Sequence, residues 1–214
     1  MKPWTTLASR KLINDRWLRL SADRCALADG TVIEPYYVME ESEWVHIVPV
    51  HDDGRMVLVS QYRYPARATC VEFPGGVVDA GETLADAAAR ELLEETGFHA
   101  RDWQSVASFF ANPARQTNRV HVFLARGLTR VSAQQLDHSE DIVCSDASTE
   151  ELFAMIKDGR FSQGLHIASF YLAMRRLNPL RATTNDERRP ISTHHFLRRL
   201  VSAVYEGNCA AHAI

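Results

Sequence analysis

The sequence predicts a mixed α/β (α+β) domain, because segments with strand character and segments with helical character follow one another along the 214 residues. Three observations indicate this class: apolar strand-like segments occur in pairs, a clearly delimited helix begins near Thr83, and two more helices follow the later strands. With 46% hydrophobic and 24% charged residues, the composition is that of a globular protein with a substantial core.

The first strand pair lies near the N-terminus. Residues 17–22 and 31–38 have strand character and flank the dipeptide Asp29-Gly30. Both turn positions tolerate positive φ, which makes this dipeptide a strong hairpin signal. We therefore expect residues 4–40 to form strands joined by turns.

The second strand pair consists of residues 44–50 and 56–62, which are separated by an Asp-Asp-Gly turn. Residues 71–73 form a further short strand, which runs into the sequence Pro-Gly-Gly at 74–76. Proline and glycine interrupt regular structure, so we expect the strand to break at this point.

A helix is predicted from Thr83 to Gly97. Thr83 can cap its N-terminus, and Asp86 favours the positive end of the helix dipole. Gly97 is suited to a left-handed C-terminal turn. A buried stripe with a period of four residues would leave the glutamates on another face; it consists of Leu84, Ala88 and Leu92.

The rest of the chain continues the alternation, with strands expected at 103–110 and 120–125 and helices at 148–158 and 166–177. The first of these helices opens with a capping box formed by Ser148 and Glu151. Three regions result: an N-terminal β-hairpin region (1–42), a central domain (43–180), and a polar linker with an amphipathic C-terminal helix (181–214).

Charge and composition restrict the possible partners. A formal charge of −3 and a pI near 6.3 disfavour a nucleic-acid partner. No apolar run approaches the about 20 residues that span a bilayer, and the N-terminus lacks a secretory signal. The four cysteines are widely spaced, so we expect reduced thiols and a cytoplasmic protein.

Four glutamates lie within 14 residues, from Glu82 to Glu95. Helical spacing places Glu91, Glu94 and Glu95 on one side, where like charges cost about 0.2–0.5 kcal/mol per pair in an isolated helix. A divalent cation on that side would remove this penalty. Carboxylate oxygens suit hard ions such as Mg²⁺ or Mn²⁺, which also bind phosphates.

This segment resembles the signature of the Nudix hydrolases at each of its constrained positions: Gly76, Glu82, Arg90, Glu91, Leu92, Glu94, Glu95, Gly97 and Phe98. The resemblance implies an α/β/α sandwich with a mixed β-sheet, extended by the N-terminal antiparallel strands and the C-terminal helical tail. It also implies hydrolysis of a nucleoside diphosphate linked to another group.

The N-terminal strands and the sequence Gln-Tyr-Arg-Tyr-Pro at 61–65 resemble the ADP-ribose and ADP-sugar pyrophosphatase branch of this family. That resemblance implies release of AMP and a sugar phosphate, and a homodimer formed through the N-terminal strands. Another nucleotide sugar, a dinucleotide or NADH remains an alternative substrate, and a non-catalytic nucleotide-binding regulator remains an alternative function.

The resemblance also implies roles for individual residues. Glu91 and Glu95 are the first candidates for metal ligands. Glu94 would share a metal or assist proton transfer, and the Gly75 carbonyl would be a further ligand. The residues with supporting roles are Gly76, which allows close approach, Glu82, which acts on a neighbouring ligand or a metal-bound water, and Arg90, which would hold the loop to the helix.

The general base is expected on the loop 136–142, where the resemblance favours Glu140 and the imidazole of His138 is an alternative. Guanidinium groups bind phosphates through two hydrogen bonds, so Arg63, Arg115 and Arg119 are the candidates for binding the substrate. The remaining histidines, including His46 and His166, show no metal-ligand spacing and are interpreted as structural or exposed.

Overall fold

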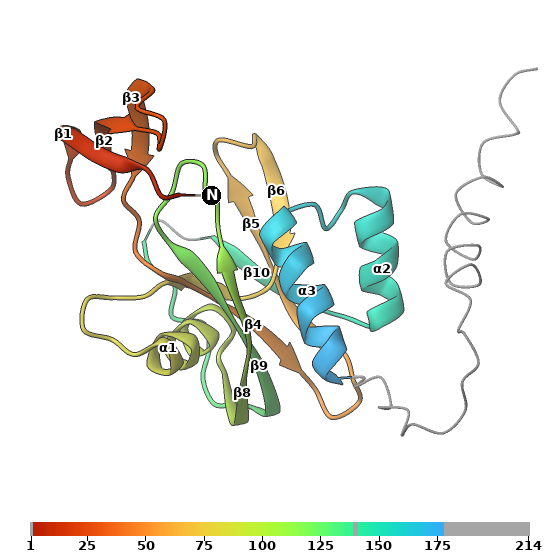
Figure 1. Cartoon of the computed structure of the whole chain (residues 1–214). Helices are drawn as coiled ribbons and strands as arrows, with labels where there is room; N and C mark the ends of the chain where they lie inside the picture. The colour runs from red at the N-terminus through yellow and green to blue at the C-terminus, as the bar shows by residue number, and fades with distance from the viewer. Residues whose placement is uncertain (1, 139–140, 178–214) are drawn as a thin grey trace, which may run out of the picture. The chain divides into compact units, whose positions relative to one another are not determined.

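The computed structural model describes residues 2–138 and 141–177. In this part of the chain a small N-terminal sheet precedes a larger mixed sheet with helices on both of its faces (Figure 1). The predicted mixed α+β class is therefore confirmed. The predicted base Glu140 and the predicted helical tail at 181–214 lie outside the described residues.

The N-terminal sheet is antiparallel and contains, in spatial order, β1 (Thr5–Asn14), β2 (Arg19–Ala26) and β3 (Val32–Met39). The predicted hairpin between β2 and β3 is confirmed, and Gly30 has the positive φ of 89° at its turn. The backbone N–H of Met39 donates to the carbonyl of Arg115 at 2.7 Å, and the Tyr36 hydroxyl donates to the carbonyl of Ala114 at 2.8 Å. These bonds attach the small sheet to the turn between β8 and β9.

The large sheet has the order β10-β5-β4-β9-β8, with β6 paired to β5 and β7 paired to β4. The β4–β9 pair is parallel and the other pairs are antiparallel. Its strands are β4 (Trp44–Val50), β5 (Met56–Arg63), β6 (Ala68–Glu72), β7 (Gly75–Val77), β8 (Phe98–Phe110), β9 (Arg119–Arg130) and β10 (Ile142–Ala147).

The predicted strands of this sheet are confirmed, and β8 and β9 extend beyond the ranges expected from sequence. The prediction that regular structure breaks through residues 74–76 is wrong in part, because Gly75 and Gly76 belong to β7. Gly76 pairs with Val45 and Gly75 pairs with His46, so the free edge of β4 supplies the partner that the local sequence lacks.

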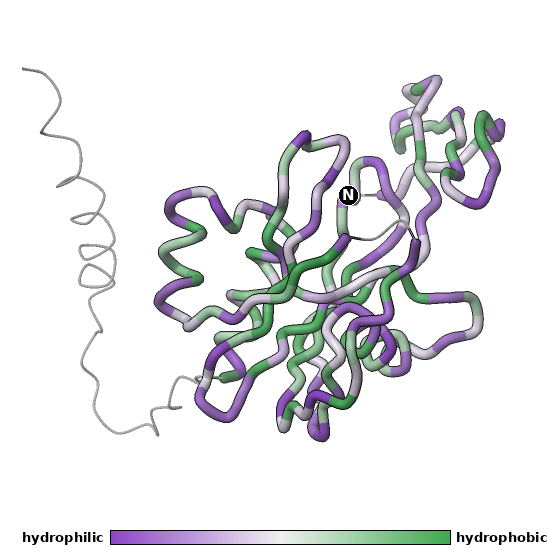
Figure 2. Tube along the Cα trace, turned by 180° about the vertical axis from the view of Figure 1, so that it is seen from behind, coloured by the Kyte–Doolittle hydropathy of each residue, from purple (hydrophilic) through white to green (hydrophobic). Residues whose placement is uncertain are grey.

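The two faces of the sheet are covered by different helices: α1 (Leu84–Thr96) on one, and α2 (Thr149–Asp158) and α3 (Gly164–Leu177) on the other. Alternate residues of β4 point to opposite faces, as strand geometry requires. Val45 and Ile47 pack with Leu92 of α1, whereas Val48 packs with Phe170 of α3. Figure 2 shows the apolar residues concentrated along the central strands between these layers.

The helix ends follow the sequence signals. The hydroxyl of Thr83 accepts from the Asp86 N–H, and Gly97 ends α1 with a φ of 72°. Ser148 and Glu151 form the predicted capping box of α2. Of the helices described, none has the combined length and apolar character needed to cross a membrane.

Candidate active site

The acidic helix α1 lies directly against β7. The buried carboxylate of Glu95 accepts a hydrogen bond from the Gly75 N–H at 2.9 Å. The prediction that all the glutamates lie on a face apart from the buried stripe is therefore wrong for Glu95, which is only 5% exposed. The bond to β7 draws this side chain inward, so Glu95 fixes the strand as well as contributing a charge.

The carboxylate of Glu91 lies against Gly76. A Cβ atom at residue 76 would be only 2.3 Å from Oε1 of Glu91, and the other two carboxylate atoms would lie within 2.8 Å. A Cβ at Gly75 would lie 2.2 Å from the backbone carbonyl oxygen of Val45. Gly75 therefore requires glycine, whereas a side chain at residue 76 would displace the Glu91 carboxylate. The two carboxylates of Glu91 and Glu95 border the same short backbone segment.

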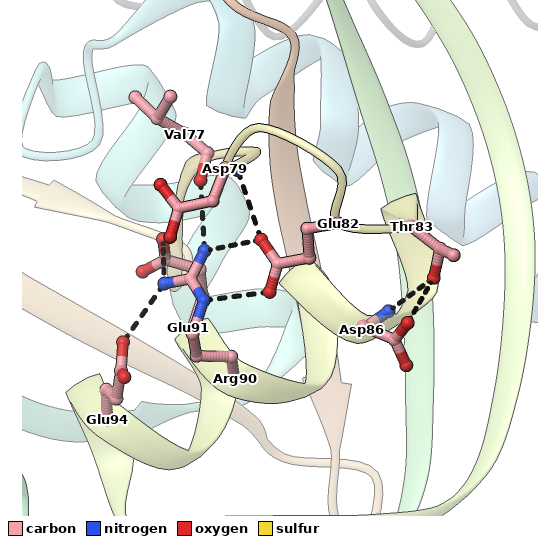
Figure 3. Close-up of polar contacts among 8 residues, drawn as sticks. All are labelled: Val77, Asp79, Glu82, Thr83, Asp86, Arg90, Glu91 and Glu94. Atoms are coloured by element: carbon pink, nitrogen blue, oxygen red, sulfur yellow. Dashed lines mark hydrogen bonds and ion pairs between the residues drawn. The ribbon is translucent and has the colours of Figure 1, made fainter.

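Arg90 connects the helix to the preceding loop (Figure 3). Its guanidinium binds both carboxylate oxygens of Glu82, at 2.9 and 3.0 Å, and donates to the Val77 carbonyl at 3.0 Å. A further nitrogen, Nη1, donates to Glu91 at 2.9 Å and to Glu94 at 3.1 Å. The hydrogen bonds to Glu82 are the main cause that raises the pKa of Arg90, and the bond from Arg90 lowers the pKa of Glu82.

The carboxylates of the acidic segment are thus hydrogen-bonded to N–H groups of the protein. Among the residues described, no three carboxylate, histidine or cysteine side chains converge on a point where they could bind a cation together. The atoms that could bind a cation at this centre are nevertheless all oxygens. Glu91 and Glu95 carry the charge, and both lie beside the Gly75-Gly76 backbone. An oxygen-only donor set of this kind fits Mg²⁺ or Mn²⁺ and not a softer metal.

Arg63, at the end of β5, is the predicted substrate-binding residue that lies near this centre. Its guanidinium donates to the buried carboxylate of Glu72 at 2.6 and 3.2 Å. Burial opposes its charge, but the hydrogen bond to Glu72 and the charges of Glu72 and Glu95 together raise the pKa of Arg63. Arg63 therefore remains a cation within the electrostatic range of Glu95.

The other two predicted arginines lie elsewhere. Arg115 is exposed on the turn that binds the N-terminal sheet. The guanidinium of Arg119 donates to the hydroxyl and the carbonyl of Ser108, at 2.7 and 3.1 Å, and its Cζ lies 4.3 Å from the centre of the Phe110 ring. Arg63 therefore lies near the acidic helix, whereas the guanidinium of Arg119 lies against Ser108 of the neighbouring strand β8.

Sequence reasoning missed the groups that hold the C-terminal end of α1. The side-chain amide of Gln134 donates to the Glu95 carbonyl at 2.6 Å and to the Ile142 carbonyl at 3.1 Å. The Cys144 thiol also donates to the Glu95 carbonyl, at 3.3 Å. The last carbonyls of a helix need partners from outside it, but no local signal identifies which residues supply them.

From the sequence, two histidines that the structure buries near residues 73–75 were also interpreted as structural or exposed. Burial is the main cause that lowers the pKa of His46 to about 3 and that of His166 well below its usual value, and the charge of Arg63 adds to both shifts. The Nδ1 atom of His166 accepts from the Phe73 N–H at 3.2 Å, two residues before Gly75. Both imidazoles are therefore neutral and belong to the surroundings of the acidic centre.

Comparison with known proteins identifies two regions. A family model described as "NUDIX domain" matches residues 43–161, and one described as "Nucleoside diphosphate sugar hydrolase N-terminal domain" matches residues 4–39. A crystal structure of an ADP compounds hydrolase has a TM-score of 0.75 at 23% identity and covers 83% of this chain and 95% of the other, which supports the same fold.

Two relatives match this chain over most of its length and most of their own. The ADP-ribose pyrophosphatase of Bacillus subtilis (strain 168) is 28% identical over 71% of this chain and 82% of its own length. The methanol dehydrogenase activator of Bacillus methanolicus is 28% identical over 72% of this chain and 84% of its own length. Because the NUDIX model covers more than half of the sequence and its signature forms the centre described above, this chain belongs to the Nudix hydrolase family.

Proposed function

We propose that this enzyme hydrolyses the pyrophosphate bond of ADP-ribose or an ADP-sugar, and releases AMP and a sugar phosphate. The observation that carries the proposal is the complete acidic signature, placed around Gly75-Gly76 and beside Arg63. The match to the nucleoside diphosphate sugar hydrolase N-terminal domain and the similarity to an ADP-ribose pyrophosphatase support this class of substrate.

The family generally depends on a divalent cation, and we propose Mg²⁺ or Mn²⁺ for this member. Glu91, Glu95 and the Gly75 carbonyl would hold it, with Glu94 as a further ligand or a participant in proton transfer. When bound, such an ion neutralises phosphate oxygens and lowers the pKa of water. Arg90 would keep the carboxylates oriented, because it already binds Glu91 and Glu94 at once.

The remaining roles concern the substrate and the proton. Arg63 would bind the pyrophosphate, since it is the predicted arginine that the structure groups with Glu95. Arg115 and Arg119 remain candidates for contacts to more distant parts of the substrate. We propose Glu140 as the general base, with His138 as the alternative on the same loop.

We also propose a homodimer formed through the N-terminal sheet. Several large apolar side chains are exposed on this sheet and the segments that flank β1, and a second copy would cover them; they are Trp4, Leu7, Ile13, Trp17 and Val32. The described cysteines, Cys25, Cys70 and Cys144, are free, which supports the proposed location in the reducing cytoplasm.

The test is incubation of the protein with ADP-ribose, ADP-glucose, a diadenosine polyphosphate or NADH, followed by chromatographic identification of the products. We expect AMP and ribose 5-phosphate from ADP-ribose in Mg²⁺ or Mn²⁺, and no turnover in EDTA. Faster turnover of another compound would replace ADP-ribose as the substrate. Tight nucleotide binding without any turnover would favour a regulator, which the similarity to the methanol dehydrogenase activator makes the relevant alternative.

A further inference from the structure

The two buried histidines form a stacked pair between the sheet and α3. His46 lies on β4 and His166 on α3, their ring centres are 3.8 Å apart, and their planes differ by 8°. Each residue is 5% exposed. Stacked imidazoles at this distance repel one another if both are charged, so the pair requires at least one neutral ring.

The hydrogen bonds of His166 determine which of its nitrogens carries the proton. Its Nδ1 accepts from the Phe73 N–H at 3.2 Å, so Nδ1 holds a lone pair and the proton is on Nε2. The Nε2 atom is 3.9 Å from Oε2 of Glu72, so its proton faces a carboxylate. His166 therefore acts as an acceptor toward the backbone and presents a positive edge to Glu72.

The hydrogen bonds of His46 imply the opposite tautomer. The Ser169 hydroxyl has one proton, which it donates to the Leu165 carbonyl at 2.9 Å. The 2.9 Å contact between Ser169 Oγ and Nδ1 of His46 must therefore be donated by His46. His46 is thus protonated on Nδ1 and His166 on Nε2, and each ring keeps its own partner.

The backbone that His166 holds leads directly to the acidic centre. Glu72 binds Arg63, Phe73 donates to His166, and the carbonyl of Pro74 accepts from the Ile47 N–H at 2.9 Å. Gly75 then donates to Glu95. The four consecutive residues are thus fixed by β5, α3, β4 and α1 in turn, and the bond from α3 is made by His166.

We propose that His166 is a positioning residue for hydrolysis: by accepting from the Phe73 N–H, it fixes the segment 72–75 that presents the Gly75 carbonyl and holds Arg63 through Glu72. This inference rests on the proposed function. His46 supports it from behind, because its stacked ring limits the rotation of the His166 ring.

The test compares His166→Leu with His166→Asn. Leucine keeps apolar bulk but removes the acceptor, whereas the Oδ1 atom of asparagine can replace Nδ1. A misplacement of about 1 Å can cost about 100-fold in rate, so we expect His166→Leu to lower kcat/KM by about 10-fold to 100-fold and to raise the metal concentration needed for half activity. We expect His166→Asn to restore both parameters to near the unchanged protein.

A role in folding alone would give a different result. Both variants would then melt at lower temperature, while kcat/KM per folded molecule and the metal requirement stayed unchanged, and this outcome would overturn the proposal. Circular dichroism and thermal melting supply the folded fraction for each variant.

A second measurement needs no variant. The ¹⁵N shifts of the two rings in the intact protein report which nitrogen is protonated, and we expect the proton of His166 on Nε2 and that of His46 on Nδ1. A proton on Nδ1 of His166 would overturn the proposal even if His166→Leu failed to fold. Absence of metal-dependent hydrolysis in the unchanged protein would instead refute the proposed function, because the ring shifts do not depend on activity.

Discussion

Replacing Gly76 with alanine would disturb the acidic centre at a single defined point. The new Cβ would lie 2.3 Å from Oε1 of Glu91, whereas ordinary contacts begin at 3.4 Å. The carboxylate must therefore move away by about 1 Å, which is possible because it is the end of a side chain. A misplacement of this size can reduce a rate by about 100-fold, and we expect a loss of that order in kcat/KM for ADP-ribose.

Gly164→Ala is the matched control. Gly164 is the first residue of α3, and a Cβ added there would meet no atom within 4 Å. Alanine is also favoured over glycine in helices by up to about 1 kcal/mol, so the control should be at least as stable and fully active. The assay is AMP release at several Mg²⁺ concentrations, with circular dichroism and thermal melting for both variants.

The reasoning would be refuted by a folded Gly76→Ala variant that hydrolyses ADP-ribose at the rate of the control. Such a result would mean that the position of the Glu91 carboxylate does not matter for hydrolysis, which would contradict its proposed role as a metal ligand. A higher metal requirement with unchanged melting would instead locate the defect at the cation.

Three more predictions concern neighbouring groups. Glu95→Gln keeps an acceptor for the Gly75 N–H but removes a charge, so turnover should fall by orders of magnitude at unchanged melting temperature; normal turnover would contradict its role. Folding lowers the pKa of His46 from about 6.5 to about 3, because the ring is buried. The neutral ring therefore stabilises the folded protein above pH 6.5, and this contribution is lost as the pH falls because the unfolded chain then binds a proton. At pH 5 the free energy of unfolding should be about 2 kcal/mol lower on this account. Urea titrations at pH 7 and pH 5 measure this fall, which His46→Asn should reduce. Gln134→Leu leaves the Ile142 carbonyl without its amide donor and should cost about 1–3 kcal/mol in the same titration, whereas an unchanged midpoint would show that water replaces the amide.

The sequence predicts the helix α1 well because its signals are local. Thr83 and Gly97 lie within a few residues of the groups that they cap, and the apolar period identifies the buried side. The same holds for the hairpin at Gly30. Each of these elements is determined by short-range geometry that a single stretch of sequence contains.

The elements that were not predicted depend on partners far along the chain. Strand β7 contains two glycines and exists because β4 offers a free edge some 30 residues earlier in the sequence. The inward turn of Glu95 depends on the same strand, since its partner is the Gly75 N–H. The bond between Phe73 and His166 joins residues 93 positions apart. Pattern and propensity carry no information about such pairings.

The position of the Gly75 carbonyl also depends on partners far along the chain. A backbone carbonyl that binds a cation must be held to within about 0.5 Å, and a glycine has no side chain with which to hold itself. Gly75 is instead held by hydrogen bonds that its neighbours and its own N–H make to β4, α1 and α3. The signature contributes the bond from the Gly75 N–H to Glu95 and the bond from Arg90 to the Val77 carbonyl. Residues outside the signature hold the segment immediately before Gly75, and His166 is one whose bond a single substitution can remove.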